Sequence, residues 1–494
     1  MGAMTRGRVG LLAALSALLL QGCMVGPDYK GPPTMTAASG QAFTRGQAVR
    51  GDATISVADW WTVLGDPTLD RLETTALAAS PDLAAAEARV REGRAKLASQ
   101  QAELLPTTGT SALYLHTHGG AGLLSSLAGS SSQSAAASSQ AAGAGSSSED
   151  FDFYEVGFDA TWEVDLFGGK RRAAQAAAAS TQAQIANLAD AQVSLTADVA
   201  RAYVNLRDQQ QRLALAQKTV ALQQKMRALT EQRAAAGTAS TLDVTRLDTE
   251  VEQSQGDLIP LQAGIEEQLD LLATLTAQAP GALDALLAVP GPVPLPPSQV
   301  AVGDPASLLR RRPDIRAAER QIASNNATIG QHVADYFPKL QLLGNLGFSS
   351  TDVSQLFDGG AFSTIVAPIL QWKPFDFGRT AAAVHEAKAE RDEAVAQYES
   401  TVLKALNDAE TALSRYGYQE KAVANLERVK ASADEAARLT RMRYQGGTTT
   451  LTDVLDTERQ RVQSEQGLAQ GQAELTQDFV ALEKSLGLGW GAGS

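Results

Sequence analysis

Residues 154–168 read YEVGFDATWEVDLFG, and this stretch decides the fold. From Tyr154 to Val164 apolar side chains occupy every second position, and most positions between them are polar or charged. A period of two is typical of a β-strand with one apolar and one polar face. A helical pattern begins after Phe167-Gly168. The stretch therefore predicts a strand that leads directly into a helix.

The same strand-to-helix boundary occurs twice, so the chain contains an internal repeat. Trp162…Phe167-Gly168 returns as Trp372…Phe377-Gly378, at an offset of 210. The same offset relates three further pairs of markers: Asp198 and Asp408, Gly237-Thr238 and Gly447-Thr448, and Asp243-Val244 and Asp453-Val454. Copy one is longer by a Ser/Ala/Gly-rich run at about 119–148, for which we expect a mobile loop.

Long helices are predicted after each boundary. Nearly 70 residues follow Gly168 without a proline, which corresponds to roughly 100 Å of helix. Apolar residues recur every seven positions at Val199, Leu206, Leu213 and Val220, and this spacing favours a left-handed supercoil. Each long helix ends at a glycine turn, after which a second helix runs back. An ordinary fibrous coiled coil would show the same periodicity.

We expect four strands per chain with alternating apolar and polar residues, the pattern of an outer-membrane β-barrel. Four strands are too few to close a barrel. Open strand edges are not tolerated in lipid, so several chains would have to share one barrel. Three chains would supply twelve strands around an aqueous bore, although other multiples are physically allowed. A soluble β-sandwich is the alternative with the same alternation.

The N-terminus has the pattern of an exported lipoprotein. Arg6 and Arg8 precede an apolar run that is too short to cross a bilayer as a helix. The run ends in Leu20-Gln21-Gly22-Cys23, which resembles the bacterial lipobox, where the cysteine is acylated and becomes the mature N-terminus. Cys23 is the only cysteine, so intramolecular disulfides are excluded. A plain secretory signal with an incidental cysteine is the alternative.

Composition and motifs exclude several functional classes. A net charge of −13 argues against a nucleic-acid partner, whose backbone needs a basic surface. No phosphate-binding loop, zinc spacing or nucleophile constellation predicts an enzyme or a cofactor. His116 and His118 share a face of an expected strand, but two ligands form a weak metal site, and we expect no metal.

Four segments together resemble the outer-membrane factor family, the TolC-, OprM- and NodT-like efflux proteins. They are Cys23 with Val25-Gly26-Pro27-Asp28-Tyr29, Asp59-Trp60-Trp61 with Asp66-Pro67, Trp162-Glu163-Val164-Asp165-Leu166-Phe167-Gly168, and Arg311-Arg312-Pro313-Asp314-Ile315. The resemblance implies a mostly α, α+β fold in which a trimeric twelve-stranded outer-membrane β-barrel continues into a long periplasmic α-helical barrel. It also implies an efflux duct that performs no catalysis and needs no cofactor.

The resemblance implies partners as well. These are two further copies of the chain, a periplasmic adaptor (membrane fusion protein), an inner-membrane pump of the resistance-nodulation-division (RND) class, and outer-membrane lipid, with palmitate on Cys23. The cargo would be drugs or other small toxic compounds. A TolC-like duct of an ATP-driven protein secretion system and a periplasmic coiled-coil structural lipoprotein are the alternatives.

We therefore expect the following organisation, with boundaries numbered along the chain. The segments are a signal peptide (1–22), a lipidated segment (23–66), repeat 1 (67–280), an equatorial linker (281–312), repeat 2 (313–486) and a tail (487–494). The expected strands are at about 107–118, 151–166, 339–350 and 361–372, and the long helices at about 168–236, 240–279, 376–446 and 449–486.

The glycine turns are the expected periplasmic tips, where the duct should narrow. By resemblance, Asp453 and Asp456 match the acidic constriction of TolC-like members, and Tyr444 and Asp243 match positions that link neighbouring tip helices in the closed state. Thr450-x-x-Asp453 and Ser240-x-x-Asp243 are also capping boxes, so capping and gating both remain open for these two aspartates. We expect Asp456 to restrict flow and Tyr444 to help hold the tip shut.

The tips are also the expected adaptor contacts. By resemblance these are Gly237, Thr238, Gly447 and Thr448, although the two glycines would serve equally as helix C-caps. The arginine that TolC-like members place two residues after the second glycine is Thr449 here. Copy one has Arg246 where copy two has Asp456, so we expect copy two to supply the gated helix pair.

Overall fold

The computed structural model describes residues 24–35, 43–44, 58–117, 151–298, 300, 305 and 311–491. Cys23, His118 and the serine-rich run lie outside these residues. The chain divides into two compact units. The strand unit comprises Met1–Gly31, Glu92–Thr181 and Gln321–Ala394, and the helical unit comprises Pro32–Arg91, Gln182–Arg320 and Val395–Ser494.

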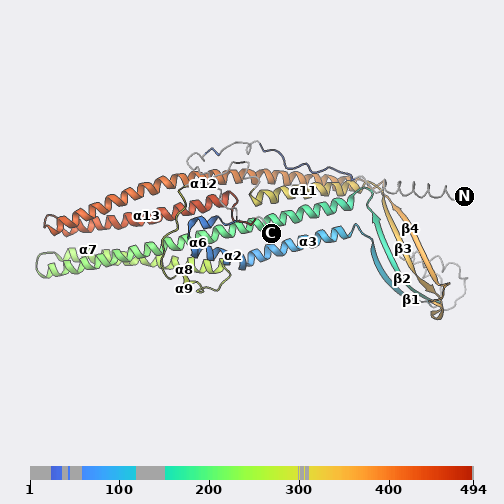
Figure 1. The fold of residues 1–494 in the computed structure, drawn as a ribbon, viewed down its shortest axis with the longest axis horizontal. Coiled ribbons are helices and arrows are strands. Elements are labelled where there is room, and N and C mark those ends of the chain that lie inside the picture. Colours follow the sequence, from blue (N-terminus) through green and yellow to red (C-terminus); the bar gives the residue numbers. More distant parts are fainter. Residues whose placement is uncertain are drawn as a thin grey trace. The chain divides into compact units, whose positions relative to one another are not determined.

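The strand unit contains one antiparallel sheet in the order β1-β2-β3-β4 (Figure 1). Its strands are β1 (Thr107–Thr117), β2 (Phe151–Val164), β3 (Lys339–Ser350) and β4 (Phe362–Gln371). A short 3₁₀ turn, η4 (Val353–Gln355), lies between β3 and β4. Among the described residues no strand pairs with the outer edge of β1 or of β4. The sheet therefore ends in two open edges.

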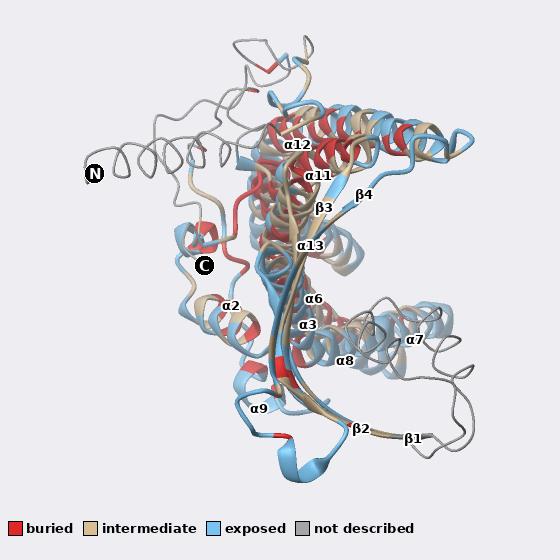
Figure 2. Cartoon of the chain, turned by 90° about the vertical axis from the view of Figure 1, so that its right-hand side faces the viewer, coloured by how far each residue is buried: buried red, intermediate tan, exposed pale blue. Residues whose placement is uncertain are grey.

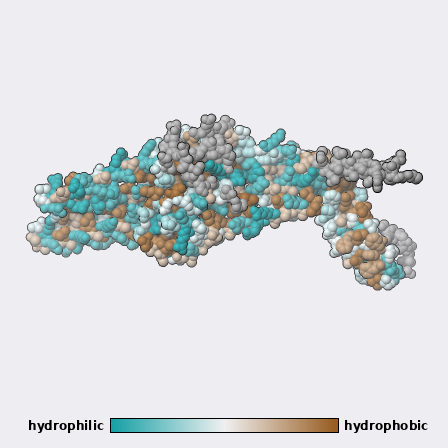
Figure 3. Space-filling view, viewed as in Figure 1, coloured by the Kyte–Doolittle hydropathy of each residue, from teal (hydrophilic) through white to brown (hydrophobic). Residues whose placement is uncertain are grey.

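Apolar and polar residues alternate along the strands, so the two faces of this sheet differ. Apolar side chains gather over the strands in the space-filling view (Figure 3). Apart from the buried Gly347, the residues of β3 and β4 are intermediate or exposed (Figure 2). On the other face, Asp159 accepts hydrogen bonds from Ser111 (2.7 Å) and Asn345 (2.8 Å), which ties β1, β2 and β3 together. The apolar face has no covering layer within the described part of the chain.

Helices make up most of the chain, and they occur in matched pairs. The short pair is α3 (Pro81–Ala102) and α11 (Pro313–Ala334), with 22 residues each. The long pair is α6 (Gly169–Ala235) and α12 (Arg379–Gln445), with 67 residues each. The returning helices are α7 (Thr241–Gly256), α8 (Leu258–Leu275) and α13 (Leu451–Ser485), and the smaller elements are η3 (Trp60–Leu64), α2 (Pro67–Ala79) and α9 (Asp284–Leu287).

The single helix expected at 240–279 is wrong, because the structure has two helices that meet at Asp257. Pro260 has no N–H to donate to the carbonyl of Gly256, and its ring would clash with that carbonyl in a continuous helix. The corresponding helix of copy two, α13, contains no proline and runs without a break. The two copies therefore differ in the continuity of their returning helix.

Aromatic packing forms the core of the helical unit. Trp60 is fully buried and meets Trp61 and Phe479 edge-on, with ring centroids 6.1 and 6.0 Å apart. Tyr416 packs on the other side of Phe479 at 6.3 Å. Along α6, Val199, Leu206 and Val220 of the seven-residue repeat are buried and Leu213 is partly buried. The buried stripes along the long helices appear in red in Figure 2.

A buried polar chain explains the Asp66-Pro67 motif. Asp66 caps α2 by accepting from the backbone of Thr68 and Leu69, and its second oxygen accepts from Tyr203 at 2.6 Å. Arg207 donates to the Tyr203 hydroxyl at 3.0 Å and to the Val289 carbonyl at 2.8 Å. Burial and the bond to Asp66 raise the pKa of Tyr203 to about 12. The motif thus joins α2, α6 and the inter-repeat linker.

Candidate functional site

The two helix tips share one backbone geometry. Gly237 and Gly447 have φ angles of 74° and 70°, the left-handed region in which glycine carries no penalty. Thr238 N–H donates to the Arg233 carbonyl at 2.8 Å, and Thr448 N–H donates to the Arg443 carbonyl at 2.9 Å. These bonds satisfy carbonyls at the ends of α6 and α12. All four expected adaptor residues are exposed, so capping leaves their surfaces available to a partner.

Asp453 and Asp243 both close capping boxes at the starts of the returning helices. Asp453 accepts from the Thr449 hydroxyl (2.6 Å), the Thr450 hydroxyl (2.7 Å) and the Thr450 N–H (2.9 Å). These hydrogen bonds lower the pKa of Asp453 to about 2. The carboxylate therefore stays charged at any physiological pH, and it is bound to its own helix end.

Asp456 lies one turn further along α13 and takes no part in the cap. Its side chain is 64% exposed, and its nearest charged neighbour is Arg459 at 3.7 Å. Arg459 makes a shorter ion pair with Glu250 of α7, at 2.7 Å. Asp456 therefore presents its carboxylate more openly than Asp453.

Tyr444 and Asp243 are not brought together as hydrogen-bond partners. The Tyr444 hydroxyl instead accepts from Arg233 at 2.6 Å, and the Arg233 guanidinium lies 5.9 Å from the centre of the tyrosine ring. Arg233 was not among the tip residues expected from the sequence. Its position could have identified it, because Arg233 lies in the last turn of α6, four residues before Gly237. Arg443 holds the equivalent position in copy two.

Two of the contacts between the two helical hairpins of one chain lie toward the tips: Arg233 to Tyr444 at the tip, and Arg459 to Glu250 further along. Farther from the tips, Lys484 of α13 lies 3.8 Å from Asp198 of α6, and Gln477 donates to Asn205. Two other ion pairs near the tips stay within one hairpin. Arg227 pairs with Asp248 between α6 and α7, and Arg441 pairs with Glu458 at 2.8 Å between α12 and α13. The contacts within hairpins and between them can therefore be altered separately.

A polar cavity of about 770 Å³ lies beside the break between α7 and α8. Its lining includes Gln209 and Gln223 of α6, Gln253 of α7, and Gln463 of α13. Glu250 and Arg459, which pair across the hairpins, also line it. Amide and charged groups at this density favour a water-filled space. Packing between the hairpins is therefore incomplete next to their ion pair.

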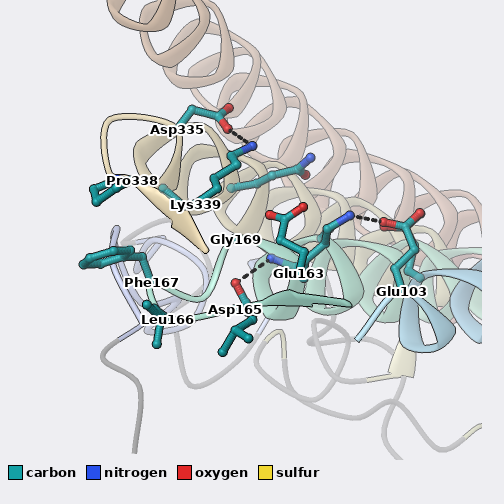
Figure 4. A pocket seen from close by; sticks show the side chains of 15 residues that line it. Glu103, Glu163, Asp165, Leu166, Phe167, Gly169, Asp335, Pro338 and Lys339 are labelled. Atoms are coloured by element: carbon teal, nitrogen blue, oxygen red, sulfur yellow. Dashed lines mark hydrogen bonds and ion pairs between the residues drawn. The ribbon is translucent and has the colours of Figure 1, made fainter. Parts of the chain in front are cut away.

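The strand unit has its own polar site, where the strands meet the helices (Figure 4). Asp165 caps α6 by accepting from the N–H groups of Lys170 (3.1 Å) and Arg171 (2.9 Å). Beside it, Lys170 pairs with Glu103 at 2.7 Å, and Lys339 pairs with Asp335 at 2.8 Å. These groups line a cavity of about 150 Å³. The TWEVDLFG motif thus supplies the cap that starts the long helix.

The segment after Cys23 packs against this junction. Val25 N–H donates to the Phe167 carbonyl at 3.1 Å, and the buried Arg172 donates to the carbonyls of Val25 and Gly26. Arg172 also pairs with Asp28 at 2.8 Å. A Cβ on Gly26 would lie 2.4 Å from the Cα of Gly330, so the VGPDY motif needs a glycine at this crossing.

His116 has a carboxylate neighbour on the adjacent strand, Asp152. Its Nδ1 lies 2.8 Å from Asp152, which also accepts from the Tyr114 hydroxyl at 2.9 Å. Residues 116 and 152 face each other across β1 and β2. No group of three potential metal ligands is found within the described ranges.

Of the helices in the described ranges, none combines the length and apolarity needed to span a bilayer.

Comparison with known proteins identifies relatives over nearly the whole chain. A family model described as outer membrane efflux protein matches residues 72–278 and 305–488. The chain is 31% identical to outer membrane protein OprJ of Pseudomonas aeruginosa, with 99% of this chain and 98% of that protein covered. It is 30% identical to the toluene efflux pump outer membrane protein TtgI of Pseudomonas putida, with 97% and 98% covered. The solved structure of the outer-membrane channel OprN matches with a TM-score of 0.81 and 34% identity, covering 95% of this chain and 100% of that one.

Proposed function

The chain belongs to the outer membrane efflux protein family and is an outer-membrane efflux channel, the exit duct of a tripartite pump. On this premise we propose that three copies form one twelve-stranded barrel in the outer membrane, continued by a helical tunnel in the periplasm. The single observation that carries this proposal is the four-stranded sheet with an apolar face and two open edges, joined to two 67-residue helices.

The membrane environment explains why the sheet cannot stand alone. Each unpaired backbone group in lipid costs several kcal/mol, so an edge strand must find a partner strand there. The open edges of β1 and β4 are matched in length to one another, with 11 and 10 residues. A ring of three sheets removes every edge.

A lipid on Cys23 fits the same arrangement. Residues 24–28 are held at the end of β2 by Phe167 and Arg172. A cysteine directly before this segment would lie near the strand-to-helix junction, where an acyl chain can enter the membrane. The lipid would then anchor each chain independently of the barrel.

We propose that a periplasmic adaptor binds the exposed tips. An inner-membrane RND-type pump would deliver drugs or other small toxic compounds to the duct. The tips suit repeated adaptor hairpins, because Gly237-Thr238 and Gly447-Thr448 present the same geometry twice per chain. In a trimer these turns would form a pseudo-sixfold ring. The chain would perform no catalysis itself.

Deletion of the gene should lower the minimal inhibitory concentration of several structurally unrelated drugs or dyes at least about fourfold. The measurement is a panel of antibiotics, dyes, solvents and metal salts, with the gene supplied again on a plasmid as the control. Proteins secreted into the medium are compared in parallel. Unchanged resistance together with a lost secreted protein would support the ATP-driven secretion duct instead.

We also place the gate at Asp456. Three such carboxylates, one from each chain, would repel one another and hold cations in a narrow bore. Replacement of Asp456 by asparagine should increase single-channel conductance in a planar bilayer by about twofold and weaken block by multivalent cations, because the charged ring is removed. Asp453→Asn is the matched control, since the Asp453 carboxylate is bound in its helix cap. An effect of Asp453→Asn equal to that of Asp456→Asn would remove Asp456 from its special role.

A further inference from the structure

The cavity of about 770 Å³ beside the break between α7 and α8 contains buried acceptors without donors. Gln223 of α6 is only 7% exposed, and its side-chain Oε1 has no hydrogen-bond partner within the described residues. The Oε1 of Gln209, one part of α6 further from the tip, is also buried without a partner there. Both side chains line the cavity. Because an unpaired buried polar atom is costly, the occupant of this space should donate hydrogen bonds.

The lining also carries a carboxylate that no arginine neutralises. Arg459 pairs with Glu250 at 2.7 Å. Arg212 pairs with Asp208, which lies outside the lining, at 3.4 Å. Asp257, at the break itself, makes no side-chain capping bond and no ion pair within the part of the chain that the structure describes. The occupant should therefore carry a positive charge as well.

Copy two shows what the same helix pair contains when its amide is satisfied. The copy-two equivalent of Gln209 is Gln419, at the offset of 210, and it donates to Glu474 at 3.1 Å and to the Gly471 carbonyl at 3.0 Å. Copy one has Gly264 in place of Glu474. A Cβ on Gly264 would collide with the Oε1 of Gln209. Copy one thus keeps the amide and lacks its carboxylate partner.

Two other members of the lining differ between the copies in the same direction. The equivalent of Gln223 is the buried Ala433, and the equivalent of Asp257 is Gly467. Alanine and glycine therefore suffice to pack a helix pair of this kind. The buried amide and the free carboxylate belong to copy one alone, so helix packing does not account for them.

We propose that this cavity binds a small hydroxylated amine in its protonated form, with the ammonium group on Asp257 and the hydroxyl groups donating to Gln209 and Gln223. The volume lies within the range of about 300–1,000 Å³ that is typical of small-molecule sites. The site is separate from the glycine turns and from Asp456, and it goes beyond the exit-duct function proposed above.

Other classes of occupant fit the lining less well. An anion would be repelled by Asp257 and would bring no donors to the two glutamines. An apolar molecule would leave both amide oxygens unpaired. Water can fill the space and satisfy the amides, but it leaves the charge of Asp257 without a counter-ion. An ammonium group with neighbouring hydroxyl donors satisfies all three side chains at once.

Titration of glucosamine into the full-length protein in detergent, followed by saturation-transfer NMR of the ligand, tests the proposal. At pH 6 the amino group is protonated, since the ordinary pKa of such an amine is about 7.7 or higher. Glucosamine should bind at least about tenfold more tightly than glucose, which has the same ring and a hydroxyl in place of the ammonium group. Wild-type protein that binds the two sugars equally would contradict the amine site.

Two variants locate the binding. Asp257→Asn should weaken glucosamine binding about tenfold and abolish the preference over glucose, because it removes the charge. It breaks no capping bond, so the fold should be retained. Gln223→Ala introduces the residue that copy two tolerates at Ala433, and it should weaken the binding of both sugars about fivefold.

Asp270→Asn is the matched control, since Asp270 is an exposed aspartate of α8 outside the lining, and it should bind glucosamine like the wild type. Binding that neither Asp257→Asn nor Gln223→Ala weakens would lie elsewhere and would overturn the proposal. The absence of saturation transfer to either sugar would show that the cavity holds water only. Each of these results would leave the exit duct intact, because the drug panel tests that function separately.

Discussion

Replacing Glu483 with glutamine should stabilise the protein at pH 7.5 by roughly 4 kcal/mol and leave it almost unchanged at pH 4. Glu483 lies near the end of α13 and is fully buried, and neither carboxylate oxygen has a hydrogen-bond partner within the described residues. Burial raises the pKa of this carboxyl to about 8. The folded chain therefore holds a neutral glutamic acid in the helical unit.

The direction of the pH dependence follows from the two pKa values. Below the ordinary glutamate value of 4.5 both the folded and the unfolded chain hold the proton, and pH has no effect. Between 4.5 and about 8 only the folded chain holds it, so unfolding releases a proton and stability falls as pH rises. Glutamine cannot ionise, so the variant should lose this decline.

Thermal unfolding followed by circular dichroism between pH 4 and pH 8.5 measures the effect. Glu458→Gln is the matched control, since Glu458 is also buried but pairs with Arg441 and Arg461, both at 2.8 Å. Its loss leaves Arg441 without its carboxylate and Arg461 with Glu465 alone, at 3.2 Å, and should destabilise the protein. A Glu483→Gln variant that follows the wild-type pH curve would show that Glu483 is ionised in the folded protein.

Glu73 is equally buried, and burial raises its pKa as well, so Glu73→Gln should act in the same direction.

Local patterns account for what the sequence could predict. The strands could be located because alternation is a property of neighbouring residues, and the long helices because nothing interrupts them between Gly169 and Ala235. The break at Asp257 was also visible in principle, since Pro260 lies inside the expected helix. It was missed because the repeat suggested a helix as continuous as α13.

Contacts between distant segments could not be derived in this way. Arg233 and Tyr444 are separated by 211 positions, and their meeting depends on how two supercoiled hairpins are rotated about their axes. By resemblance, Asp243 and Tyr444 were both expected to link neighbouring tip helices, but the Asp243 carboxylate accepts from the Ser240 hydroxyl of its own helix cap. Likewise, no local pattern reveals that Gly26 must pass within van der Waals contact of Gly330. The side-chain charge and size that such a crossing of distant segments requires can be determined only from the folded structure.

Removing both tip-side contacts between the hairpins, Arg233–Tyr444 and Arg459–Glu250, should open the channel more than removing either one. The double variant Tyr444→Phe with Glu250→Gln removes the hydroxyl that accepts from Arg233 and the negative charge that pairs with Arg459, and it leaves the ion pairs inside each hairpin in place. Exposed pairs of this kind contribute about 0.5 kcal/mol each. Over three chains that open together, the loss would be roughly 3 kcal/mol, or about a hundredfold in the closed-to-open ratio.

Single-channel recording and sensitivity to a large antibiotic that normally cannot cross the outer membrane provide the two measurements. The double variant should spend far more time in high-conductance states, and cells that carry it should become sensitive to the antibiotic. Asp248→Asn is the matched control, because it breaks the Arg227 pair inside one hairpin and leaves both tip-side links between hairpins intact. If Asp248→Asn opens the channel as readily, general loosening of the tips explains the effect. If only the double variant does, the tips of the two hairpins of each chain are held together at Tyr444 and Glu250, and opening proceeds by separation of the tips.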